Sequence, residues 1–132
     1  MKFVDSTFII SLLRSDRSTI EKARELDEAG GAATTAINVY EVAYGAQRHL
    51  PDVRKGVSEL DRVLLNMEVY PLNYEAAEKA AEIAGSLDRR GVSIGALDSL
   101  VAAIALVNGA DTLVTRNVSH FEWVSGLKIE KH

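Results

Sequence analysis

Residues 93–106 read SIGALDSLVAAIAL, an almost wholly apolar segment with a single carboxylate, Asp98. The helix predicted here has no polar face wide enough for a position on the protein surface. We therefore expect it in the interior, covering a hydrophobic layer. The longest uninterrupted apolar run, LVAAIALV at 100–107, is far too short to span a membrane. A charged residue at the start of a buried helix calls for a structural or chemical reason.

Short apolar segments alternate with helical segments along the rest of the chain. The pattern predicts strands at 2–4, 32–37, 68–72, 111–115 and 127–131. It predicts helices at 6–14, 18–30, 38–50, 52–67, 73–90 and 96–108, and a loop with at most one helical turn at 116–124. Ser18 and Glu21 have the spacing of a capping box at the start of the second helix. This alternation predicts an α/β fold in which a mostly parallel central sheet is covered by helices on both faces.

Composition limits the class of protein. A chain of 132 residues with 47% hydrophobic and 26% charged residues is typical of one compact globular domain. It has no cysteine, which excludes a disulfide framework and a thiol nucleophile and agrees with a cytoplasmic location. The formal net charge of -4 argues against a general nucleic-acid coat protein. We expect no membrane association.

Polar residues cluster where the predicted strands end. In parallel sheets, ligands bind outside the carboxyl ends of the strands. Asp5 follows the first strand directly, and Thr115, Arg116 and Asn117 follow the strand at 111–115. Helices begin at this same edge, so residues in their first turns can join the strand ends.

Glu41 and Asp98 stand near the starts of two such helices, and each has a purely structural interpretation. Glu41 could form a capping-box-like pair with Asn38, and Asp98 could be favoured by the helix dipole. Asp5 could be the N-cap of the first helix. Asn117 and His120, in the segment TRNVSHF, could be ordinary turn residues.

Four segments considered together resemble a known family. They are FVDST at 3–7, INVYEVAYGA at 37–46, ALDSLVAAIAL at 96–106 and LVTRNVSHF at 113–121. Their order and spacing resemble the PIN domain, and more narrowly the VapC toxins of prokaryotic toxin–antitoxin pairs. The resemblance implies a PIN-like three-layer α/β/α sandwich and a single PIN domain over residues 1–132.

The same resemblance implies an endoribonuclease that depends on Mg²⁺ or Mn²⁺. Asp5, Glu41 and Asp98 match the acidic metal site of the family, and Asn117 matches its fourth position, which is often aspartate. Clustered carboxylates repel each other and become tolerable when a divalent cation binds. The resemblance therefore supplies a chemical reason for Asp98 at the start of the apolar helix.

Three further residues beside this acidic group are candidates for substrate binding. Arg116 could neutralise the scissile phosphate or the leaving oxygen. Ser6 and Thr115 could form hydrogen bonds with the carboxylates or with the phosphate. We therefore expect all three side chains at the same edge of the sheet.

The family also implies partners: an RNA substrate, a VapB-like antitoxin and a second copy of the chain in a homodimer. Apolar residues of the first helix, Phe8, Ile9, Leu12 and Leu13, could form a groove for an antitoxin helix or belong to the core.

Two other classes of protein remain for comparison. A catalytically weak PIN-like module that only binds RNA or protein is the main alternative, and Asn117 in place of an acid is the best argument for it. A phosphatase or receiver domain on a similar sheet is disfavoured. A phosphatase of this kind needs the motif D-x-D after the first strand, where this chain has DST at 5–7. A receiver domain needs paired acids near its start and a lysine after a late strand, and neither is evident.

Overall fold

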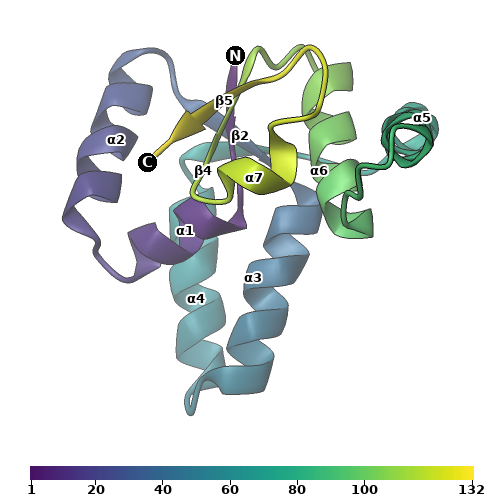
Figure 1. Cartoon of the computed structure of the whole chain (residues 1–132). Coiled ribbons are helices and arrows are strands. Elements are labelled where there is room, and N and C mark those ends of the chain that lie inside the picture. The colour runs from purple at the N-terminus through teal and green to yellow at the C-terminus, as the bar shows by residue number, and fades with distance from the viewer.

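A computed structural model describes all residues, 1–132, as a five-stranded sheet with seven helices (Figure 1). The strands are β1 (Lys2–Val4), β2 (Ala32–Thr35), β3 (Met67–Tyr70), β4 (Thr112–Thr115) and β5 (Lys128–Lys131). The helices are α1 (Ser6–Leu13), α2 (Arg17–Glu28), α3 (Ala36–His49), α4 (Val53–Leu64), α5 (Tyr74–Arg89), α6 (Ala96–Val107) and α7 (Val118–Phe121).

The sheet has the strand order β3-β2-β1-β4-β5, and every neighbouring pair is parallel. The predicted α/β class is therefore confirmed, and the sheet is entirely rather than mostly parallel. Strands β1 and β4 lie side by side at its centre, with Val4 opposite Val114. All five strands end at the same edge, so the residues that follow β1 and β4 are neighbours although about a hundred positions separate them.

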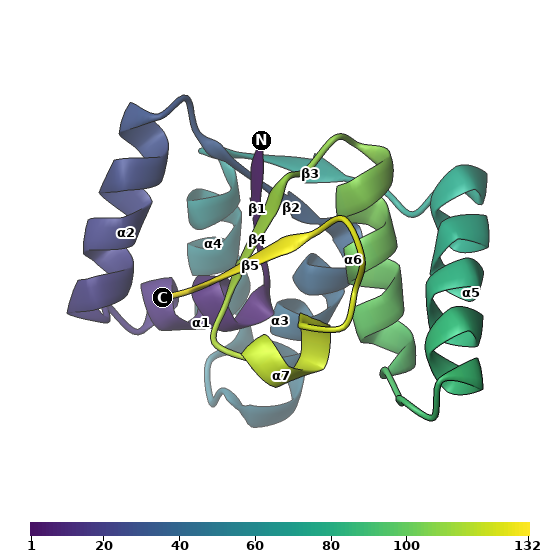
Figure 2. The same ribbon diagram turned by 45° about the horizontal axis from the view of Figure 1, so that its top comes forward.

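Helices cover both faces of the sheet, which confirms the three-layer arrangement. Phe3 and Leu113 face a core that includes α5 and α6, whereas Val4 and Val114 face a second core formed with α1 to α4. Successive strand residues point to opposite faces, so β1 and β4 contribute one large side chain to each core. Figure 2 shows α5 and α6 on one side of the sheet and α1, α2 and α4 on the other.

The apolar segment around Asp98 forms α6, and its predicted interior position is confirmed. The buried residues of α6 include Val101, Ala102, Ala103, Ile104 and Ala105. The helix packs on α5 in the core that contains Phe3 and Leu113, which is the larger of the two cores. Alanines on both helices allow their backbones to approach closely. No helix in the structure is both long and apolar enough to cross a bilayer.

Two predicted helix starts were wrong. The N-cap of α2 is Asp16, whose carboxylate accepts a hydrogen bond from the backbone N–H of Thr19 at 3.1 Å, so Ser18 and Glu21 form no capping box. The N-cap of α3 is Thr35, which places Asn38 inside the helix. In both cases an earlier polar residue could accept the same orphan N–H groups, and sequence spacing alone does not separate such candidates.

Candidate functional site

The carboxyl ends of β1 and β4 open into a hollow of about 360 Å³. Residues from the starts of α1, α3 and α6 and from α7 surround it, and in Figure 2 α7 lies between α1 and α6. Its lining residues are Asp5, Ser6, Asn38, Glu41, Gly95, Ala96, Leu97, Asp98, Asn117, His120 and Phe121. The structure therefore brings together the four residues that the resemblance assigns to the acidic site.

Asp5 is the N-cap of α1 and also lines this hollow, so the capping role and a position at the predicted site occur together. Its side chain is almost fully buried and accepts hydrogen bonds from the backbone N–H of Phe8 at 3.2 Å and from the hydroxyls of Thr7 and Thr115, each at 2.5 Å. Burial raises the pKa of Asp5, and these hydrogen bonds oppose the rise. Three donors thus fix a carboxylate that the protein interior disfavours.

Glu41 projects from α3 toward the same hollow. Its carboxylate accepts hydrogen bonds from the hydroxyl of Ser6 at 3.1 Å and from the side-chain amide of Asn38 at 3.4 Å. Burial raises the pKa of Glu41, and the nearby charges of Asp98 and Asp5 raise it further. The three carboxylates therefore interact electrostatically, as expected for a site built to receive a cation.

Asp98 occupies the first turn of α6, with 24% of its side chain exposed. One carboxylate oxygen lies 3.0 Å from Nδ1 of His120, a residue of α7. Asn117 is the N-cap position of α7 but forms no side-chain capping bond, so its amide is free to face the hollow. Its backbone N–H donates to the Thr115 hydroxyl at 2.9 Å, which ties α7 to the end of β4.

Arg116 does not line the hollow. Its guanidinium donates to the Asp16 carboxylate at 2.8 Å and to the Thr19 hydroxyl at 3.4 Å, at the start of α2. Hydrogen bonds from Thr19 and Ser18, with the charge of Arg116, lower the pKa of Asp16 to about 2. In this structure the Arg116 guanidinium therefore lies beside the hollow, paired with the Asp16 carboxylate.

Sequence reasoning missed three residues of this site. His120 was assigned to a turn, Asn38 was assigned to a helix start, and Thr7 was not considered. His120 pairs with Asp98, Asn38 connects Glu41 to the Thr35 hydroxyl, and Thr7 holds Asp5. The signals that could have found these residues were the segments INVYEVAYGA and LVTRNVSHF, which contain Asn38 and His120, and the position of Thr7 two residues after Asp5.

The fit of a metal ion depends on the donors and on their spacing. The site presents carboxylate and amide oxygens, the hard ligands that Mg²⁺ prefers. No three acidic or histidine side chains converge closely enough to surround one ion directly. Mg²⁺ keeps several waters and uses only one or two carboxylates directly, so the donor set fits a partly hydrated ion.

Comparisons with known proteins agree with this geometry. The chain is 29% identical over 96 residues to the tRNA(fMet)-specific endonuclease VapC of Salmonella typhimurium, covering 73% of this chain and 71% of the relative. It is 27% identical over 128 residues to ribonuclease VapC1 of Rickettsia felis, covering 96% and 92% of the two chains.

Solved structures share the fold. The toxin–antitoxin complex VapBC2 of Rickettsia felis, bound to a DNA fragment from its promoter, contains a chain that superposes with a TM-score of 0.90. That match has 23% identity and covers 99% of this chain and 98% of the other. VapBC of Salmonella typhimurium, also bound to DNA, matches with a TM-score of 0.86 and 24% identity over 98% and 96% of the chains. The PIN domain profile matches residues 2–124, so the chain belongs to the PIN domain family.

Proposed function

We propose that residues 1–132 act as a single PIN domain that hydrolyses RNA phosphodiester bonds, as the toxin of a toxin–antitoxin pair. The observation that carries this proposal is the meeting of Asp5, Glu41 and Asp98, with Asn117, around one hollow. Four distant segments of the sequence contribute these side chains. The endonuclease and ribonuclease named among the relatives support the same activity here.

The proposed reaction uses Mg²⁺ or Mn²⁺ bound at the carboxylates. A divalent cation at this position supplies charge neutralisation for a phosphate oxygen and a lower pKa for a bound water. Asp5 and Asp98 would hold the ion most directly, and Glu41 would hold it through water or orient the attacking water. The raised pKa of Glu41 supports this assignment, since a cation would relieve the repulsion that contributes to it.

The remaining polar residues position ligands or substrate. Asn117 would serve as an outer ligand through its side-chain amide, and Thr115 and Ser6 keep the Asp5 and Glu41 carboxylates in place. Arg116 would meet the RNA phosphate only after exchanging its Asp16 partner for it. Phosphate and carboxylate are similar partners for a guanidinium, which makes that exchange chemically reasonable.

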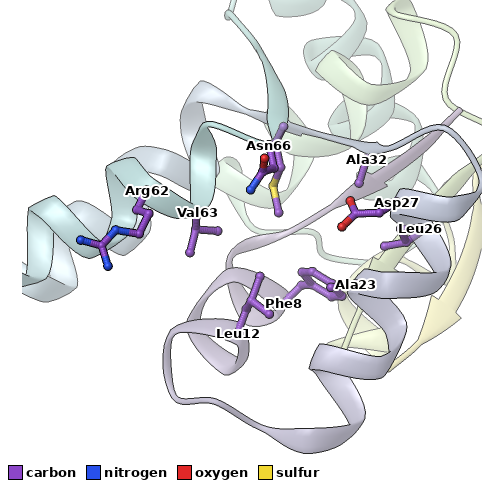
Figure 3. Close-up of a pocket in the computed structure, with 10 residues that line it drawn as sticks. Phe8, Leu12, Ala23, Leu26, Asp27, Ala32, Arg62, Val63 and Asn66 are labelled. Carbon is purple, nitrogen blue, oxygen red and sulfur yellow. The ribbon is translucent and has the colours of Figure 1, made fainter.

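The antitoxin partner is assigned to a second hollow, of about 220 Å³, between α1, α2 and α4 (Figure 3). Phe8 and Ile9 are fully buried core residues, whereas Leu12 is only partly buried and lines this hollow beside Phe8. Asp27 and Arg62 also line it, as Figure 3 shows. An apolar floor with charges of both signs suits a segment of a VapB-like protein. The VapBC complexes among the structural neighbours support a VapB-like partner for this chain.

The homodimer is assigned to the exposed side of α3. Tyr40 and Tyr44 stack at 5.9 Å between ring centroids, and they are 56% and 50% exposed. Such aromatic area in water favours association with a second copy. Size-exclusion chromatography of the wild-type chain and a Tyr40→Lys, Tyr44→Lys variant tests this. A monomeric wild type, or an unchanged elution of the variant, would contradict the assignment.

The nuclease proposal is tested in cells, because we expect the protein to act on RNA in the cytoplasm. The chain is expressed without an antitoxin, and the 5′ ends of cellular RNA are sequenced. New ends should accumulate at defined sites with the wild type and be missing with the Asp5→Ala control. Identical 5′ ends in both samples would favour the alternative of a non-cleaving binding module.

A further inference from the structure

The three carboxylates of the acidic hollow are held by different numbers of hydrogen bonds. Asp5 accepts three and Glu41 accepts two. Asp98 accepts one, and its donor is His120. The start of α6 supplies no other side-chain donor to Asp98. Gly95 at the N-cap has no side chain, and the Ser99 hydroxyl donates to the Ala96 carbonyl.

The backbone confines Asp98 from one side and His120 confines it from the other. A Cβ atom placed on Gly95 would lie 3.4 Å from the Asp98 carboxylate oxygen Oδ2, so this oxygen packs directly over the start of α6. The same oxygen lies 3.0 Å from Nδ1 of His120. A carboxylate accepts only, so Nδ1 carries the proton and donates. The second oxygen, Oδ1, makes no hydrogen bond and is free for a ligand.

The position of His120 is fixed by its neighbours in α7. Phe121 is buried in the larger core, and the His120 backbone N–H donates to the Asn117 carbonyl at 3.0 Å. Half of the imidazole remains exposed, so the ring contributes little to the core. Its one side-chain hydrogen bond is the bond to Asp98, which indicates a role at the site rather than in packing.

We propose that His120 is a positioning residue that orients the Asp98 carboxylate for the divalent cation. This inference rests on the proposed nuclease function and adds to it a residue that acts through a metal ligand. A ring N–H that fixes one oxygen of a carboxylate leaves the other aimed at the ion. This hydrogen bond then disfavours rotation of Asp98 away from the hollow before the ion binds.

Two substitutions separate the hydrogen bond from the bulk of the ring. His120→Phe keeps a planar ring of similar size and removes the donor. His120→Asn replaces Nδ1 with an amide nitrogen that can donate from nearly the same place. His49→Phe is the matched control, because His49 is an exposed histidine on α3 outside the acidic hollow. Thermal unfolding establishes that each variant is folded.

The measurements are Mn²⁺ affinity by calorimetry, without RNA, and the kcat and KM of RNA cleavage. We expect His120→Phe to weaken Mn²⁺ binding and to lower kcat, each by roughly 10- to 100-fold, the usual cost of losing a group that orients a metal ligand. KM should change by less than about threefold, since substrate contacts remain. His120→Asn should recover most of both losses, and His49→Phe should match the wild type.

Wild-type Mn²⁺ affinity in His120→Phe would overturn the proposal, as would a change confined to KM. Failure of His120→Asn to recover any Mn²⁺ affinity would also overturn it, because the donor would then not be the functional feature. Failure of the nuclease proposal gives a different result: a wild-type protein that binds Mn²⁺ but cleaves no RNA. The calorimetric comparison still decides the role of His120 in that case.

Discussion

The Thr115 hydroxyl donates a hydrogen bond to the Asp5 carboxylate at 2.5 Å, across the junction of β1 and β4. The two residues lie 110 positions apart in the chain. Asp5 directly follows β1, and Thr115 is the last residue of β4. Both side chains are buried. The parallel pairing of β1 with β4 therefore builds the floor of the acidic hollow, and the geometry of the sheet controls the position of its most buried carboxylate.

Replacing Thr115 with valine should damage the site without changing side-chain volume. Asp5 loses one of the donors that oppose the effect of burial, so its pKa should rise further and the acidic limb of the pH–rate profile should move to higher pH. We expect kcat to fall by roughly 10- to 100-fold. Thr112→Val, at the other end of the same strand, is the control for strand packing and should leave the profile in place. An unshifted profile for Thr115→Val would show that this hydrogen bond does not tune Asp5.

Glu41→Gln should increase thermal stability while it removes activity. The pKa of Glu41 is raised in the folded protein, first by burial and then by Asp98 and Asp5, so its charged form disfavours folding. This penalty is present above the raised pKa and disappears as the pH falls below the value of the unfolded chain. In EDTA at neutral pH the variant should therefore have a higher melting temperature than the wild type. The difference between the two melting temperatures should disappear as the pH is lowered. A variant that melts lower at neutral pH contradicts this account.

Arg116 and Asp16 provide a test of substrate binding. Arg116→Met removes the guanidinium, whereas Asp16→Asn breaks the same ion pair, keeps a capping side chain on α2 and leaves the guanidinium free. If Arg116 contacts the RNA phosphate, Arg116→Met should raise KM by about tenfold, the worth of one charge-assisted hydrogen bond, and Asp16→Asn should not. Equal KM values in both variants would restrict Arg116 to a structural role.

Glu130 connects β5 to two other elements, and its loss should weaken the fold modestly. Its carboxylate pairs with Lys2 of β1 and Lys22 of α2, and hydrogen bonds from these two lysines lower the pKa of Glu130. The stabilisation is therefore present above the pKa of the unfolded chain and is lost as the pH falls through the lowered folded value. Glu130→Gln should cost up to about 1 kcal/mol of unfolding free energy at pH 7. Glu28→Gln, on the exposed end of α2, is the control. Equal losses of unfolding free energy in both variants would contradict a specific role for the ion pairs of Glu130 with Lys2 and Lys22.

The sequence predicts β1, β4 and the buried helix well because their signals are local. The strand predicted at 32–37 ends at Thr35, because Thr35 caps α3 and Ala36 and Ile37 belong to that helix. Alternation and apolar runs define β1 and β4, and the absence of a polar face defines α6. Helix starts are less predictable, since Asp16 and Ser18 are equally suitable caps and only the backbone geometry selects Asp16. The site residues likewise differ in whether local sequence reveals them. Asp5 is found from its position after a strand, whereas His120 becomes visible only when the fold places it against Asp98.

Cleavage of labelled RNA by purified protein, with Mg²⁺ and with EDTA, tests the central claim most directly. The wild type should cut in Mg²⁺ and lose all activity in EDTA. Asp5→Asn and Asp98→Asn keep the size of each side chain and remove the charge that a cation needs, so each should lose more than about 100-fold in kcat while remaining folded. Thr112→Val should cut like the wild type. Cleavage that persists in EDTA, or in either aspartate variant, would contradict a nuclease that depends on a cation held by these carboxylates.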